Sequence, residues 1–215
     1  MTAADPDLAL RADAQRNRRQ LLEAAAAAFA EGGIDVPADE IARRAGVAKG
    51  TLFRHFPTKE DLIAAVLRDR IGQVRAVIAE IEATREPGLA AVAELMGRAA
   101  AIIAADRSFF DAAMRDGGER PGLYAEKLAF EQELDALVAR AQASGEVRAD
   151  VVGADIAMLV LAATNTCAPS QALCPELWRR YLALMVDGLR PGATTPLAVP
   201  ALDHAALEHL SAAAG

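Results

Sequence analysis

Apolar residues recur at helical spacing along most of the chain, and glycine and proline separate the periodic segments. The longest segment follows Thr58 and keeps a stripe of leucine, isoleucine and valine as far as Ile81. Thr58 is a suitable N-cap, and Asp61 lies in the first turn, where an acid offsets the helix dipole. The pattern therefore predicts a helix from Thr58 to about Thr84, a rod of roughly 40 Å.

Shorter periodic segments predict the remaining helices, and neither strand-like alternation nor an internal repeat is present. These helices span about residues 16–31, 38–45, 49–56, 89–105, 108–116, 121–144, 153–168 and 175–189. Gly46 is suited to a left-handed helix end, and Pro121 and Pro175 are suited to first turns. Residues 191–215 form a tail rich in proline, glycine and alanine, with a short helix expected after Asp203. The expected fold class is all-α.

Composition agrees with closely packed helices in a globular protein. Hydrophobic residues make up 53% and charged residues 25%, but aromatic residues only 4%, so alanine, leucine, valine and isoleucine must supply the core. No apolar run approaches the length of a membrane span, and the N-terminus has no apolar signal-peptide core. Cys167 and Cys174 are too few for a disulfide framework. We therefore expect a cytoplasmic protein without membrane contact.

The net charge of −7 at first argues against a nucleic-acid partner, but the charge is distributed unevenly. Residues 10–60 hold nine lysines and arginines against seven acids, whereas residues 61–215 carry a net charge of −7. Local charge decides whether phosphates are bound, and the charge of the whole chain is a poor guide. A mildly basic N-terminal part therefore precedes an acidic body.

Chemically informative residues concentrate in the stretch VAKGTLFRHF, residues 47–56. Residues 39–56 predict two short helices joined by a turn that contains Gly46, which is the helix-turn-helix layout. Apolar side chains such as Ile41, Leu52 and Phe56 can pin the two helices together. The polar side chains between them are of the kinds that contact phosphates and base edges in the major groove.

This stretch resembles the N-terminal domain of TetR-family transcriptional repressors. The resemblance rests on GVAKGTLFRHFPTKEDL, preceded by LLEAAAAAFAEGGI and IARRAG, and covers about residues 15–66. The run LWRRYLALMVDGLRP at 177–191 is also similar to the last helix of some members. The resemblance implies a flexible arm at 1–14, a helix-turn-helix domain at 15–60, and a helical ligand-binding and dimerisation domain at 61–190. The long helix would join the two domains.

The resemblance also implies which residues contact an operator in double-stranded DNA. The implied contacts are Lys49, Gly50, Thr51, Phe53 and His55, with Lys59 on a phosphate. Arg54 falls at a variable position facing the groove, which makes it a candidate reader of sequence. Phe53 stands where the family usually has tyrosine, so it cannot donate a hydrogen bond to a phosphate. Arg16, Arg18 and Arg19 could clamp the flanking backbone.

Structural interpretations compete with these assignments. Arg43 and Arg44 are expected to be solvated, with Arg44 pairing with Glu40 four residues earlier. His55 could be a structural histidine and Phe53 a core residue. The arginines at 16–19 could simply be the charged start of a helix.

The resemblance further implies that the second domain holds a small apolar or amphipathic effector and forms a homodimer, and no cofactor is expected. The candidate pocket residues are Phe109, Phe110, Met114, Tyr124, Phe130, Met158, Thr164 and Asn165. Ordinary core packing is the alternative for the apolar ones, whereas Thr164 and Asn165 need partners if buried. By resemblance, the last two long helices form the dimer surface, with a seam of Trp178, Leu182 and Met185.

Other chemistry has little support in the sequence. No GxSxG elbow, Walker loop or CxxC motif occurs, and no metal site is expected from His204 and His209 in the tail. A thiol sensor at Cys167 and Cys174 remains an alternative. One rival function is a helical protein-interaction dimer whose N-terminal domain no longer binds DNA. Another, with less support, is an all-α enzyme. Steep salt dependence of DNA binding would distinguish a regulator from the interaction protein.

Overall fold

The computed structural model describes residues 6–105, 123–170, 172–192 and 195–201, and these fold into α-helices without strands. The helices are α1 (Pro6–Gly32), α2 (Ala38–Arg44), α3 (Lys49–His55), α4 (Lys59–Thr84), α5 (Leu89–Ala105), α7 (Tyr124–Ala143), α8 (Gly153–Thr166) and α9 (Leu177–Asp187). A 3₁₀ turn, η1 (Ala168–Ser170), follows α8. The all-α prediction is confirmed. The helices expected at 108–116 and after Asp203 lie outside the described residues, as does Pro121.

Two helix boundaries differ from the sequence-based prediction. Helix α1 begins at Pro6, not near residue 16, so residues 6–14 of the expected flexible arm are helical. Proline is compatible with the first helical position, and no glycine or β-branched residue follows it before Arg16. Helix α9 begins at Leu177 after Glu176 as N-cap, so Pro175 precedes the helix and is not in its first turn.

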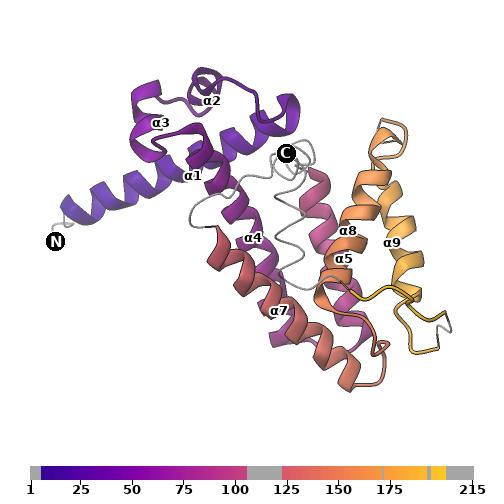
Figure 1. The fold of residues 1–215 in the computed structure, drawn as a ribbon. Helices are drawn as coiled ribbons and strands as arrows, with labels where there is room; N and C mark the ends of the chain where they lie inside the picture. The colour runs from indigo at the N-terminus through magenta and orange to yellow at the C-terminus, as the bar shows by residue number, and fades with distance from the viewer. Residues whose placement is uncertain (1–5, 106–122, 171, 193–194, 202–215) are drawn as a thin grey trace.

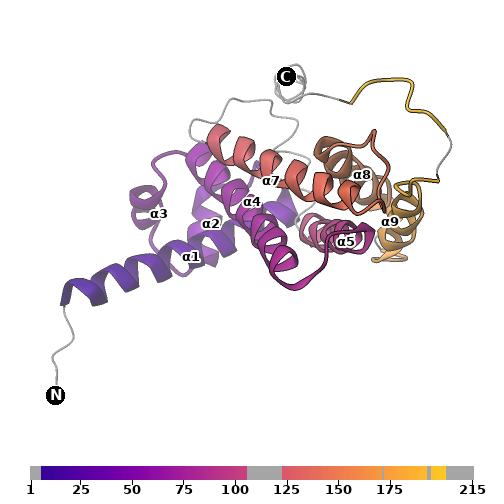
Figure 2. The same cartoon turned by 90° about the horizontal axis from the view of Figure 1, so that it is seen from below.

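Helices α1, α2 and α3 and the first turns of α4 form an N-terminal unit, here called the head (Figure 1). Its core contains the buried side chains of Leu21, Ala25, Phe29, Ile41, Leu52, Phe56, Leu62 and Leu67. Gly46 has a φ of 69° and follows the end of α2, as expected for a left-handed helix end. In the head, α1 extends well beyond α2 and α3 (Figure 2).

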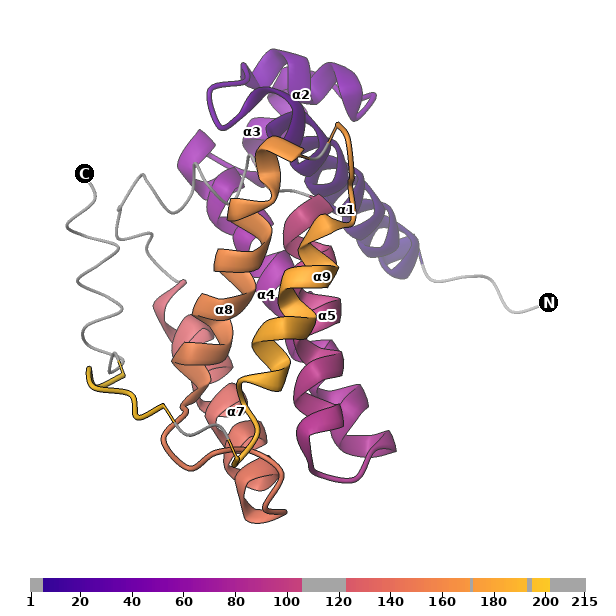
Figure 3. The same cartoon turned by 90° about the vertical axis from the view of Figure 1, so that its right-hand side faces the viewer.

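The rest of α4 packs with α5, α7, α8 and α9 in a second unit, here called the body. Its core contains Val77, Ile81, Val92, Met96, Leu134, Leu137, Val160, Trp178 and Leu182, among others. Helices α8 and α9 lie side by side on the face opposite α4 (Figure 3). None of the described helices combines the length and hydropathy of a membrane span.

Helix α4 starts in the head and continues into the body (Figure 1). Its start is fixed by a capping box: the amide of Asp61 donates to Thr58 Oγ1 at 3.0 Å, and the amide of Thr58 donates to Asp61 Oδ2 at 3.0 Å. The sequence-based prediction of this cap is confirmed. The capping box therefore fixes the residue at which α4 begins, and three residues separate this start from the end of α3.

Candidate DNA-binding interface

The turn between α2 and α3 sets the position of α3 on the head. The amide of Val47 donates to the carbonyl of Ala42 at 3.0 Å, which closes the turn around Gly46. Leu52 in α3 and Phe56 just after it are almost fully buried against Ile41 and the rest of the head core. Because α3 has only two turns, these apolar anchors and not its own hydrogen bonds must hold it in place.

The residues that were expected to contact DNA occupy the rest of the α3 surface, and one of them, Phe53, also packs partly against the head core. Lys49, Gly50 and Arg54 are exposed, and Thr51, Phe53 and His55 are half-buried. A Cβ at Gly50 would meet no atom within 4 Å, so the protein's own packing does not require glycine there. The open space leaves room for an external group to approach the backbone at the start of α3.

Several of these side chains are positioned by contacts within the head. Lys49 Nζ lies 2.6 Å from Asp39 Oδ1 and 6.0 Å from the centre of the Phe53 ring. Arg54 Nη2 donates to Thr51 Oγ1 at 2.9 Å. Both cationic groups stay solvent-accessible in these contacts, and an exposed ion pair such as that of Lys49 with Asp39 is weak enough to be exchanged for a phosphate.

The arginines of α1 add positive charge beside α3. Arg16, Arg18 and Arg19 are exposed, and the guanidinium of Arg18 lies 5.0 Å from the centre of the Phe56 ring. Phe56 directly follows α3, so this cation–π contact joins α1 to the end of that helix. Lys59, half-buried at the start of α4, extends the basic surface on the other side.

Arg43 and Arg44 are engaged in an ion-pair network on α2. Glu40 Oε1 lies 2.6 Å from Arg43 Nη2 and 2.8 Å from Arg44 Nε, and Arg44 Nη1 lies 2.7 Å from Glu31. Hydrogen bonds from Arg43 and then Arg44 lower the pKa of Glu40 to about 2. The predicted pairing of Arg44 with Glu40 is confirmed.

Only some of the candidate pocket residues lie in the part of the chain that the structure describes, and these differ in their surroundings. Phe109, Phe110 and Met114 lie outside the described residues, and Tyr124 is the first residue of α7. Phe130 packs against the body core, whereas Met158 and Asn165 are exposed on α8. Thr164 is buried, but its hydroxyl donates to the carbonyls of Val160 and Leu161 in its own helix. Its polar group is thereby satisfied without a ligand.

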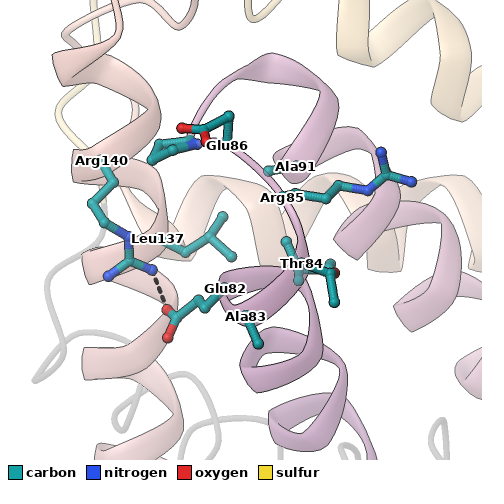
Figure 4. A pocket seen from close by; sticks show the side chains of 10 residues that line it. Glu82, Ala83, Thr84, Arg85, Glu86, Ala91, Leu137 and Arg140 are labelled. Atoms are coloured by element: carbon teal, nitrogen blue, oxygen red, sulfur yellow. Dashed lines mark hydrogen bonds and ion pairs between the residues drawn. The ribbon is translucent and has the colours of Figure 1, made fainter.

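A hollow of about 620 Å³ lies instead at the end of α4 farthest from the head. Figure 4 shows it between the α4–α5 turn and α7, with Glu82, Glu86 and Arg140 among its lining residues. Ion pairs already engage Glu82 with Arg140 and Arg85 with Glu94. The sequence alone does not predict this hollow, because its residues come from segments more than forty positions apart.

The seam predicted on α9 is not exposed in the chain. Trp178 and Leu182 are only 5% exposed and belong to the body core, and Met185 is half-buried against it. The large apolar side chains that are exposed on α8 and α9 are Met158 at 46%, Tyr181 at 43% and Leu184 at 61%. Helix α9 is apolar on two faces, and the predicted seam is the face that packs inward.

The described part of the chain contains no cluster of histidine, cysteine and acidic residues that could hold a metal ion. Cys167 is buried and Cys174 is exposed, and both are free thiols. Burial raises the pKa of the Cys167 thiol, which makes it less reactive.

Two family models match the chain in succession. Residues 21–66 match the model described as bacterial regulatory proteins of the tetR family. Residues 86–191 match the C-terminal domain of SbtR-like transcriptional regulators. The two matches correspond to the head with the start of α4 and to most of the body.

Solved structures of TetR regulators match over both units. A TetR transcriptional regulator from Streptomyces coelicolor is 32% identical, covers 82% of this chain and 99% of its own, and gives a TM-score of 0.63. One from Mycobacterium vanbaalenii is 39% identical over 84% and 99% of the two chains, with a TM-score of 0.61. FadR from Bacillus subtilis, solved with stearoyl-CoA, has a TM-score of 0.62 at 20% identity over 80% and 99% of the two chains, which shows a common fold alone.

Curated transcriptional regulators match a shorter part of the chain. The regulator SrpR of Pseudomonas putida is 40% identical over 60 residues, which are 27% of this chain and 28% of SrpR. TtgW of Pseudomonas putida is 38% identical over 60 residues, or 45% of its length. The chain thus matches less than half of the length of these curated relatives.

Proposed function

The chain belongs to the TetR family of transcriptional regulators, and from this premise we propose that it is a cytoplasmic repressor released from its DNA operator by a small molecule. The observation that carries the proposal is the two-sided construction of α3. Leu52 and Phe56 anchor the helix in the head core, while Lys49, Gly50 and Arg54 are exposed. A recognition helix needs both properties to enter a major groove in a fixed orientation.

On this proposal, each residue of the basic surface has a defined role. Lys49, Thr51 and His55 bind the operator, and the open space at Gly50 lets the DNA backbone approach. Phe53 packs on a sugar or a thymine methyl, and Arg54 reads base edges. Lys59 and the arginines of α1, including Arg16 and Arg19, contact flanking phosphates. Arg43 and Arg44 are not among the proposed DNA contacts, because both are engaged in the ion-pair network around Glu40.

We further propose that the protein acts as a homodimer through the outer face of α8 and α9. Support comes from Met158, Tyr181 and Leu184, which are large apolar side chains exposed on two adjacent helices. A second copy would cover them in an isologous four-helix contact. Two heads held in this way would place their recognition helices about 34–36 Å apart, in successive major grooves.

The effector is proposed to be a small apolar or amphipathic molecule bound by the body, with no cofactor and no catalysis. The fold shared with FadR, which was solved with stearoyl-CoA, is compatible with a ligand of that class. Release requires that the effector bind more tightly to a conformer whose heads no longer match the operator. The rival function is a protein-interaction dimer whose head does not bind DNA. Such a protein would still dimerise but would show no selective DNA binding.

Two cations, the exposed Arg54 and the half-buried Lys59, should behave differently if Arg54 reads sequence and Lys59 contacts phosphate. We expect Arg54→Ala to change which duplexes are selected from a random pool and to cost about 1–3 kcal/mol on the preferred one. Lys59→Ala should weaken binding to all duplexes similarly. It should also reduce the slope of log affinity against log salt concentration by about one. Selection and titration of both variants give the comparison, and equal losses that ignore sequence would remove Arg54 as a reader.

A further inference from the structure

Three ion pairs connect α4 to α7 at regular intervals. Arg68 Nε donates to Glu126 Oε1 at 2.7 Å, and Arg75 makes two bonds to Glu133, at 2.9 Å and 2.5 Å. The third pair is Glu82 with Arg140. In each pair the partners are 58 residues apart in the chain, and successive pairs are seven residues apart. The two helices therefore run parallel, with one ion pair every two turns, a set here called the ladder.

Both helices also extend from the head core to the body core. In α4, Leu62 and Leu67 lie in the head core and Ile81 lies in the body core. Leu123, the residue before α7, is 7% exposed and belongs to the head core, whereas Leu137 of α7 lies in the body core. The head is thus attached to the body by the starts of two parallel helices, as Figure 1 shows for α4 and α7.

We propose that the ladder joins α4 and α7 into a single moving unit, so that the head changes its position only when both helices move together. The consequence for operator release rests on the proposed function, but the mechanical coupling does not. A displacement of α4 along α7 by one turn, about 5.4 Å, would break all three ion pairs together. Movement of the joined pair against α5 and α8 would preserve them.

The order of charges fits only this register of the two helices. In the first two pairs the arginine is on α4, whereas in the third it is on α7. A shift of seven residues in one direction would bring Glu82 beside Glu133. The opposite shift would bring Arg75 beside Arg140. Like charges that face each other destabilise a helix pair, so the reversed third pair disfavours both shifted registers.

Each pair of the ladder is half-exposed, so no single pair is strong. Arg75 has the most favourable geometry, because its two nitrogens contact both oxygens of Glu133. The contact with Arg75 lowers the pKa of Glu133, and Arg68 likewise lowers the pKa of Glu126. Both glutamates therefore remain ionised and available to the ladder well below neutral pH.

The middle pair offers the sharpest test, because Arg75 lies about 6 Å along α4 beyond Ile71, the last side chain of the helix that packs on the head core. We would measure hydrogen exchange of the free protein for Arg75→Glu, Glu133→Arg and the double exchange of both charges. Each single variant should speed exchange at the start of α7 and in the head helices by roughly threefold to tenfold, since it replaces attraction by repulsion. The double variant should return exchange to the parent rate.

Arg98→Glu is the matched control, because Arg98 of α5 is as exposed as Arg75 but pairs with Glu80 of α4 and with Glu94 of its own helix. It should leave exchange in the head unchanged. Parent-like exchange in both single variants, or equal acceleration by Arg98→Glu, would overturn the proposal. Hydrogen exchange is measured without DNA. Its result therefore tests the coupling of α4 and α7 independently of whether the protein regulates transcription.

Discussion

We expect the Leu184→Glu variant to be monomeric and to lose at least about a hundredfold in affinity for an operator with two half-sites. Leu184 is the most exposed large apolar side chain on α9, and the proposed dimer would bury it. A carboxylate buried there without a partner would cost more than the interface gains from a leucine. With one head per molecule, the advantage of binding both half-sites together is lost. Sedimentation velocity and titration of the operator would measure the two effects.

Ala183→Glu is the matched control for this prediction. Ala183 is also exposed, but it lies about 100° around α9 from Leu184 and away from Tyr181. The control variant should remain dimeric and bind DNA like the parent. A dimeric Leu184→Glu variant with parent affinity would show that the two subunits associate through some other surface.

The second large effect is expected from Leu52→Ala. Leu52 is fully buried between α3 and the rest of the head, and it is the most deeply buried apolar side chain of this helix. Removal of such a side chain typically costs about 2–5 kcal/mol. Because α3 is too short to be stable alone, we expect the variant to lose DNA binding at every salt concentration. Thermal unfolding should show a destabilised head with a largely unaffected body.

Arg54→Ala provides the comparison for Leu52→Ala, because it changes the same helix at an exposed position. It should alter DNA selection without a measurable change in unfolding. If the Leu52→Ala variant had the thermal stability and the DNA affinity of the parent, the position of α3 could not depend on its buried face.

The head could be predicted closely from the sequence because its signals are local. Gly46 ends α2, Thr58 caps α4, and both effects act within a few residues. The apolar positions at Leu52 and Phe56 fix which side of α3 packs inward. The early start of α1 was missed because residues 6–14 carry no stripe that would pack on the head, although nothing in them interrupts a helix.

The body was predicted less well, because its important features depend on packing between distant segments. Helix α9 has an inner stripe with Trp178 and Leu182 and an outer one with Tyr181 and Leu184, and periodicity cannot tell which faces the core. The ladder is likewise invisible in the sequence, because nothing local relates Arg75 to Glu133 fifty-eight residues later. Only the packing of α4 on α7 brings them together.

The most direct test of the central claim is binding of the purified protein to the intergenic DNA upstream of its own gene, compared with a scrambled duplex at two salt concentrations. We predict tight, selective binding to the upstream duplex that weakens steeply between 50 mM and 200 mM salt, by roughly a thousandfold if six or more phosphates are contacted. Weak binding of the same strength to both duplexes would contradict the regulator function and favour a protein-interaction dimer.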